Sequence, residues 1–144
     1  MKKTALVLTI LLASQLSHAH SFTNGTYKGN GLWNSKTKNG GYQVSTVIDN
    51  NTVKTHYTLP DGNARDWNFD MQPGKSTFFD VVTQGVKVGT GYCLEKASVC
   101  HYELTVGPMK LEETLVQQGT KFYRYGSKDE GQGPIMWQES TDKE

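Results

Sequence analysis

The sequence predicts an all-β protein, a single antiparallel up-and-down barrel of about eight to ten strands. Two observations predict this fold. Short segments rich in Val, Thr, Tyr, Phe and Trp alternate between apolar and polar residues, and no convincing helical segment interrupts them. The turns between them are too short for a parallel crossover, which needs about a dozen residues. Closure into a barrel removes the exposed edge strands of such a meander, and a two-sheet β-sandwich is the alternative.

The first five strands are expected over residues 25–33, 41–49, 52–60, 65–71 and 76–84. They are separated by the turn sequences NSKTKNG, DNN, PDGNA and QPGK, which are rich in Gly, Asn, Asp and Pro. RDWNFDM alternates most clearly, because Trp, Phe and Met occupy every second position with Asp, Asn and Asp between them. One face of these strands is therefore apolar and aromatic, and the other is polar.

The last five strands are expected over residues 86–95, 99–106, 110–118, 121–127 and 134–140. The turn sequences QG, EKAS, GP, QGT and KDEGQG precede them in that order. The same alternation continues to the end of the chain, where PIMWQES places an isoleucine and a tryptophan on one face.

Residues 1–19 have the pattern of a bacterial secretory signal peptide. A basic start is followed by an apolar run over residues 4–13 and by small side chains, Ser17 and Ala19, at the −3 and −1 positions. The apolar run is too short to cross a bilayer as a helix. We expect cleavage after Ala19, which leaves residues 20–144 as one domain of 125 residues (144 − 19) in the periplasm or outside the cell.

The charge of the exported chain is close to neutral. Removing Lys2 and Lys3 from the 15 basic side chains leaves 13 against 14 acidic ones, a formal net charge of −1. A nucleic-acid or anionic-membrane partner would require a basic face, so neither partner is expected. We expect a monomer.

Both cysteines lie in the exported chain, and an oxidising compartment favours a disulfide between them. If Glu95 to Ser98 form the turn, Cys93 lies directly opposite Cys100, at a separation that permits a bond. This register puts Gly89 and Gly91 on the same face of the hairpin as the large side chains of Tyr102 and Leu104. Either the glycines make room for those side chains, or a bulge at GTG switches the faces of the strand.

Alternation also selects the residues expected inside the barrel. The inward aromatic side chains suit a small apolar or aromatic ligand, although a fully packed interior would use the same pattern. The candidate ligand-binding residues are Tyr42, Tyr57, Trp67, Phe69, Tyr102 and Trp137.

The segments NGLW and KFYRYG resemble the lipocalins and their relatives in the calycin superfamily. Gly31 and Trp33 are similar to the G-x-W motif, whose Trp closes one end of the barrel and stacks on a basic side chain from a late strand. Arg124 has the place of that basic partner. The resemblance implies a calycin-like barrel that binds small apolar molecules. Ten strands would fit the fatty-acid-binding or nitrobindin-like branches better than the eight-stranded lipocalins.

No catalytic motif is present: the chain has no G-x-S-x-G elbow, Walker loop, H-E-x-x-H or zinc-spaced Cys/His cluster. Glu112 and Glu113 are adjacent on a strand and therefore point to opposite faces, one outward and one inward. They cannot work as a carboxylate pair. We expect a non-catalytic protein without a cofactor.

Cleavage after Ala19 would make His20 the first residue of the exported chain. Its amine and ring nitrogen could bind copper as a histidine brace, with His56 or His101 as the third nitrogen ligand. This resembles copper-dependent polysaccharide monooxygenases and some periplasmic copper carriers. The match is one residue long, so an accident of the cleavage position is the simpler interpretation.

Three functions follow from these patterns. The first is an exported barrel that binds a small apolar or aromatic molecule. The second is a protein-interaction module, such as an enzyme inhibitor, that uses the loops 34–41, 60–64 and 127–133. The third is the copper protein.

Overall fold

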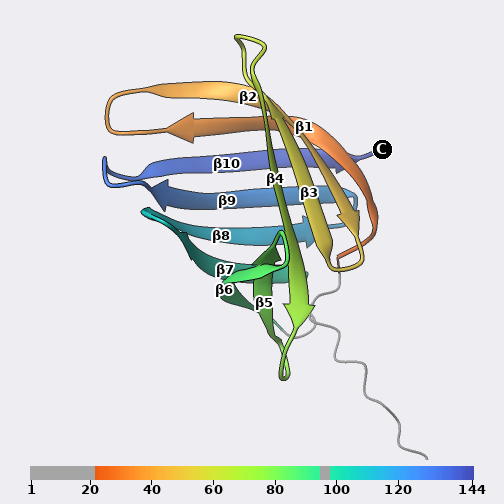
Figure 1. The fold of residues 1–144 in the computed structure, drawn as a ribbon. Helices are drawn as coiled ribbons and strands as arrows, with labels where there is room; N and C mark the ends of the chain where they lie inside the picture. The colour runs from red at the N-terminus through yellow and green to blue at the C-terminus, as the bar shows by residue number, and fades with distance from the viewer. Residues whose placement is uncertain (1–21, 95–97) are drawn as a thin grey trace, which may run out of the picture.

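The computed structural model describes residues 22–94 and 98–144, which form ten antiparallel strands (Figure 1). The strands are β1 (Gly25–Asn34), β2 (Asn39–Asp49), β3 (Thr52–Thr58), β4 (Ala64–Pro73), β5 (Phe78–Thr83), β6 (Val86–Cys93), β7 (Val99–Val106), β8 (Met109–Gln118), β9 (Lys121–Asp129) and β10 (Ile135–Lys143). The predicted signal peptide and His20 lie outside the described residues. No helix long and apolar enough to cross a membrane occurs in the described ranges.

Each strand pairs with its sequence neighbours, and β1 also pairs with β10, which closes the barrel. In Figure 1, β3 and β4 cross in front of the wall formed by β8, β9 and β10. The predicted all-β up-and-down barrel is confirmed, and the β-sandwich alternative is excluded.

The ten expected segments coincide with the ten strands, but several ends differ. The first hairpin is longer than expected, because Asn34 pairs with Asn39 and shortens the turn between them. The last strand continues to Lys143, where it pairs with the start of β1. Pairing between β1 and β10, which closes the barrel, determines where the last strand ends. The alternation of apolar and polar residues in that strand did not predict this end.

The two ends of the barrel interior differ in how they are filled. Toward the start of β1 and the end of β2, large apolar side chains pack against one another, among them Tyr27, Ile48, Phe69 and Phe122. Aromatic rings meet here; those of Tyr27 and Phe122, for example, have centroids 5.4 Å apart. The opposite end of the barrel interior is hollow.

The Cys93–Cys100 disulfide is present, with the two residues directly opposite each other in the β6–β7 ladder. The glycines of β6 make room for large neighbours, which decides between the two alternatives. A Cβ atom on Gly91 would lie 2.3 Å from the ring of Phe79 and 2.7 Å from Cβ of Tyr102. The irregular register lies on the other side of β6, in its pairing with β5.

Candidate functional site

A cavity of about 420 Å³ occupies the hollow end of the barrel. Five aromatic side chains contribute to its walls: Trp33, Tyr42, Tyr57, Trp67 and Trp137. They come from β1, β2, β3, β4 and β10, so the aromatic lining surrounds the space instead of lying on one side of it. A cavity of this size and lining is typical of small-molecule sites.

Glycines on neighbouring strands leave room for these rings. A Cβ atom on Gly31 would lie 2.2 Å from Cζ of Tyr42, and one on Gly126 would lie 2.9 Å from Cζ2 of Trp137. Gly31 and Gly126 stand directly opposite Tyr42 and Trp137 in their ladders. Pairs of a glycine and an aromatic residue across strands therefore shape the wall of the cavity.

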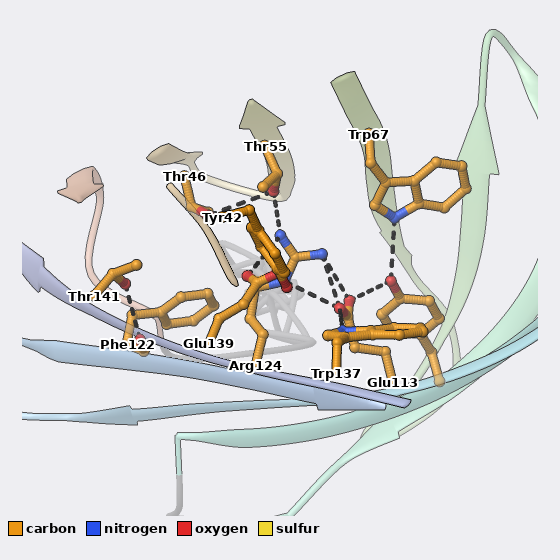
Figure 2. Close-up of polar contacts among 11 residues, drawn as sticks. Tyr42, Thr46, Thr55, Trp67, Glu113, Phe122, Arg124, Trp137, Glu139 and Thr141 are labelled. Atoms are coloured by element: carbon orange, nitrogen blue, oxygen red, sulfur yellow. Dashed lines mark hydrogen bonds and ion pairs between the residues drawn. The ribbon is translucent and has the colours of Figure 1, made fainter. Parts of the chain in front are cut away.

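A buried ion pair forms the floor. Nη2 of Arg124 lies 2.9 Å from both carboxylate oxygens of Glu113, and Nε donates to Oε1 at 3.1 Å. Nη1 donates to Oγ1 of Thr55 on the opposite wall (Figure 2). Both charged side chains are 1% exposed. Charges removed this far from water are costly unless they are paired and hydrogen-bonded, as these two are.

Glu113 also accepts hydrogen bonds from two further side chains. The hydroxyl of Tyr102 donates to Oε2, and Nε1 of Trp137 donates to Oε1 at 3.1 Å. Nε1 of Trp67 in turn donates to the hydroxyl of Tyr102 at 3.3 Å. The indoles of two wall residues are thus tied to the charged floor (Figure 2).

Glu139 on β10 is the second buried carboxylate of the floor. Its Oε1 accepts a hydrogen bond from the hydroxyl of Tyr42 at 2.8 Å. Its Oε2 lies 3.7 Å from Nη1 of Arg124 and has no hydrogen-bond partner among the described residues. Burial raises the pKa of Glu139, against the opposing effect of the Arg124 charge.

The tyrosine hydroxyls around the floor remain protonated. Burial raises the pKa of Tyr42, Tyr57 and Tyr102, and the nearby carboxylates raise it further. Burial by itself would lower the pKa of Arg124, but the charge of Glu113 and its other neighbours raise it well above its ordinary value. Arg124 is therefore a permanent cation, and the hydroxyls of Tyr42 and Tyr102 act as hydrogen-bond donors to Glu139 and Glu113.

Four of the six residues predicted to bind a ligand line the cavity: Tyr42, Tyr57, Trp67 and Trp137. The other two lie deeper. Phe69 belongs to the packed core, with its ring centroid 4.9 Å from that of Tyr102. Tyr102 is fully buried and contributes through its bond to the floor.

Trp33 and Arg124, the expected closing pair, both line the cavity. The ring centroid of Tyr57 is 6.0 Å from Cζ of Arg124, so the guanidinium has a tyrosine ring at the distance of a cation–π contact. Closure itself is achieved by the ladder between β1 and β10, in which Trp33 stands opposite Trp137.

Sequence reasoning missed Glu139 and Thr55 and assigned no role to Glu113. The signal for Glu139 was available, because it follows Trp137 by two residues and so shares its inward face. The expectation that one of Glu112 and Glu113 points inward is met: Glu113 is buried and Glu112 is exposed.

The two described histidines of the copper hypothesis lie on the outer surface and have other neighbours. Nδ1 of His56 lies 2.7 Å from Oδ1 of Asp66. Nδ1 of His101 lies 2.9 Å from Oγ1 of Thr114, and potential ligand atoms of His101, Glu103 and Glu112 lie within 4.8 Å of one another. That group does not include His56.

A second hollow, of about 450 Å³, is lined largely by outward-facing side chains such as Glu103, Lys110 and Glu112. Its lining residues come from β6, β7, β8 and β9, and the aromatic residues of the first cavity do not contribute to it. The interior cavity is therefore the candidate site.

Neither the models of known protein families nor the curated proteins give a match to this sequence. The closed ten-stranded antiparallel barrel is established by the structure. Membership of the calycin superfamily, which the motif at Gly31 and Trp33 implies, stays a prediction.

Proposed function

We propose that this is an exported, non-catalytic barrel that binds a small molecule with an apolar or aromatic body in the interior cavity. The observation that carries the proposal is the ring of five aromatic side chains around a space of about 420 Å³. Large flat side chains supply much contact area and lose little conformational freedom, which suits them to a binding wall.

The buried floor supports binding over a purely structural role. An interior that served only stability would be filled by hydrophobic side chains, since replacing a buried ion pair by them is often neutral or stabilising. Here Arg124, Glu113 and Glu139 instead lie together where the aromatic walls end. Polar groups at the base of an apolar pocket fix the orientation of a ligand.

The proposal assigns no catalytic role to Glu113. Both oxygens of Glu113 accept hydrogen bonds from Arg124, and further donors from Tyr102 and Trp137 complete its environment. A carboxylate held in this way has no free lone pair directed at a substrate, so it is a poor general base. Its role in the proposal is to hold Arg124 and the indole of Trp137 in place.

Tryptophan fluorescence tests the proposal directly, because the three tryptophans of the chain all line the cavity. Saturable quenching by a neutral apolar probe, such as retinol or a long-chain fatty alcohol, supports binding of an apolar ligand. We expect Trp67→Ala to weaken binding by at least about tenfold, since it removes one wall. Tyr125→Ala, which truncates an exposed aromatic residue of β9, is the matched control and should leave binding unchanged. Absence of saturable quenching by every probe would contradict the proposal.

A second candidate is a protein-interaction module, favoured by aromatic side chains on the outer surface. Phe78 is 60% exposed and Tyr92 43% exposed, with ring centroids 6.4 Å apart, and His101 extends the group. Exposed apolar side chains that gather in this way are typical of contact surfaces. A partner that the wild-type protein retains and a Phe78→Ser/Tyr92→Ser variant loses would support this candidate.

A further inference from the structure

Oε2 of Glu139 is a buried acceptor that no described residue satisfies. The side chain is 1% exposed and belongs to the lining of the cavity. A buried polar group without a hydrogen bond costs free energy, and each such group in a folded protein calls for an explanation. A ligand that donates a hydrogen bond to this oxygen would supply the missing partner.

Arg124 has little to offer a ligand. Its Nε and Nη2 donate to Glu113, and Nη1 donates to Thr55 and faces Glu139 at 3.7 Å. An anionic group entering the cavity would therefore find the guanidinium already engaged and would meet the carboxylate of Glu139. This arrangement disfavours carboxylate and phosphate head groups.

The charges of the floor add up to an excess of one negative charge when both carboxylates are ionised: one positive (Arg124) and two negative (Glu113 and Glu139). The other titratable groups that face Glu139 are Tyr42 and Tyr57, which are neutral hydroxyls. A cation bound beside Glu139 would balance this excess.

The basic side chains at the mouth of the cavity do not change this balance. Arg65 is exposed, and Lys128 pairs with Glu130 at 3.0 Å. Charges in contact with water are screened, whereas those of the dry floor are not.

The aromatic walls also favour a positively charged ligand. Trp and Tyr rings present a negative face to a cation, and the attraction strengthens where water is excluded. Tyr42, Tyr57 and Trp137 lie beside the floor, and Tyr42 also binds Glu139 directly. An aromatic enclosure around a buried carboxylate is a chemical match for an organic cation.

We infer that the cavity takes a protonated amine carried on an aromatic or apolar body, with the ammonium group donating to Oε2 of Glu139. This inference rests on the proposed function and names the ligand class of the same site. The body of the ligand contacts the aromatic walls, and the head group replaces the missing hydrogen-bond partner.

Three matched probes test the inference by isothermal titration calorimetry of the purified protein at neutral pH. They share a naphthalene ring and a short side chain and differ in charge: 2-(1-naphthyl)ethylamine is a cation, 2-(1-naphthyl)ethanol is neutral, and 1-naphthylacetate is an anion. We expect the amine to bind at least about tenfold more tightly than the alcohol, and the acid to bind most weakly.

Glu139→Gln removes the charge and keeps an acceptor for Tyr42. It should reduce the affinity for the amine to about that for the alcohol and leave the alcohol unaffected. Glu112→Gln removes an equivalent charge on the outer face of the barrel and should preserve the preference for the amine. If the Glu139→Gln protein does not fold, the order of affinities of the three probes for the wild-type protein tests the inference alone.

Equal affinity for the three probes, or tightest binding of the acid, overturns the inference and leaves the proposed function standing. Absence of amine binding also overturns the inference. The fluorescence titration with apolar probes described above then tests the proposed function separately.

Discussion

The guanidinium of Arg124 and the two carboxylates around it have lost nearly all contact with water. Burial raises the pKa of Glu139 above its ordinary value of 4.5. The unfolded chain holds this carboxyl at its ordinary pKa, so the folded protein binds the proton more tightly. The stability associated with protonated Glu139 is therefore present below the ordinary pKa and is lost as pH rises through the folded one.

The first prediction follows from the direction of this change in stability with pH. The free energy of unfolding of the wild-type protein minus that of Glu139→Gln should decrease as pH rises from about 4.5 through the raised pKa. Urea denaturation of both proteins at a series of pH values measures the difference. A difference that stays constant or grows over this range would contradict the assignment of the raised pKa to Glu139.

The ion pair itself gives the second prediction. Arg124→Met leaves Glu113 buried without its cation and should cost about 3–5 kcal/mol of stability. Glu113→Leu combined with Arg124→Met removes both charges and should recover a large part of that loss. Chemical denaturation of the single and double variants provides the measurement. A double variant as unstable as the single one would show that the buried charges are not coupled.

The strands are held close together by glycines at positions where a side chain would collide with the next strand. Gly126 of β9 is one of them, because a Cβ atom there would lie 2.2 Å from the backbone oxygen of Glu112 and 2.9 Å from the ring of Trp137. A backbone oxygen within a ladder cannot move away cheaply. Gly41 of β2 has its nearest neighbour at 3.6 Å, an ordinary contact.

The third prediction compares these two glycines. Gly126→Ala should cost about 1–3 kcal/mol by overpacking and should also weaken ligand binding, because Trp137 must shift. Gly41→Ala, the control on another strand, should cost less than about 1 kcal/mol, because a Cβ atom at Gly41 meets no close neighbour. Thermal unfolding of both variants measures the contrast, and equal losses would mean that the close approach at Gly126 does not exist.

The hairpin of β6 and β7 gives the fourth prediction. Its disulfide closes a short loop, so replacing Cys93 and Cys100 together by Ala should cost about 2 kcal/mol and leave the fold intact. Peptide mapping without reduction identifies the bond in the exported protein, and denaturation of the double variant measures its contribution. Free thiols in the exported protein would refute the pairing.

At the scale of the whole molecule, the barrel combines a packed end and a hollow end. Strand alternation predicted the fold and the inward faces, because period-2 patterning and short turns leave few other solutions. It did not reveal how deep each inward residue lies along the barrel axis. Phe69 and Trp67 share one strand face, yet one is in the core and the other lines the cavity.

The charged floor was beyond sequence reasoning for a related reason. Thr55 is 69 residues from Arg124 in the chain, and they meet only because the barrel closes. Alternation could have placed Glu139 inside, but a single glutamate near the end of a strand gives no indication of its partners. Those partners are Arg124 on β9 and Tyr42 on β2, and they depend on the register of β10 with β9 and, through β1, with β2.

The central claim is that this cavity binds a ligand, and the indole N–H signals of the three tryptophans test it most directly. Trp33, Trp67 and Trp137 all line the cavity. In a nitrogen–proton correlation spectrum, titration with 2-(1-naphthyl)ethylamine or with the neutral 2-(1-naphthyl)ethanol should shift all three indole signals along one saturable curve with a single dissociation constant. Indole signals that stay in place with both probes, or that shift in proportion to the concentration of each without saturating, would contradict the account.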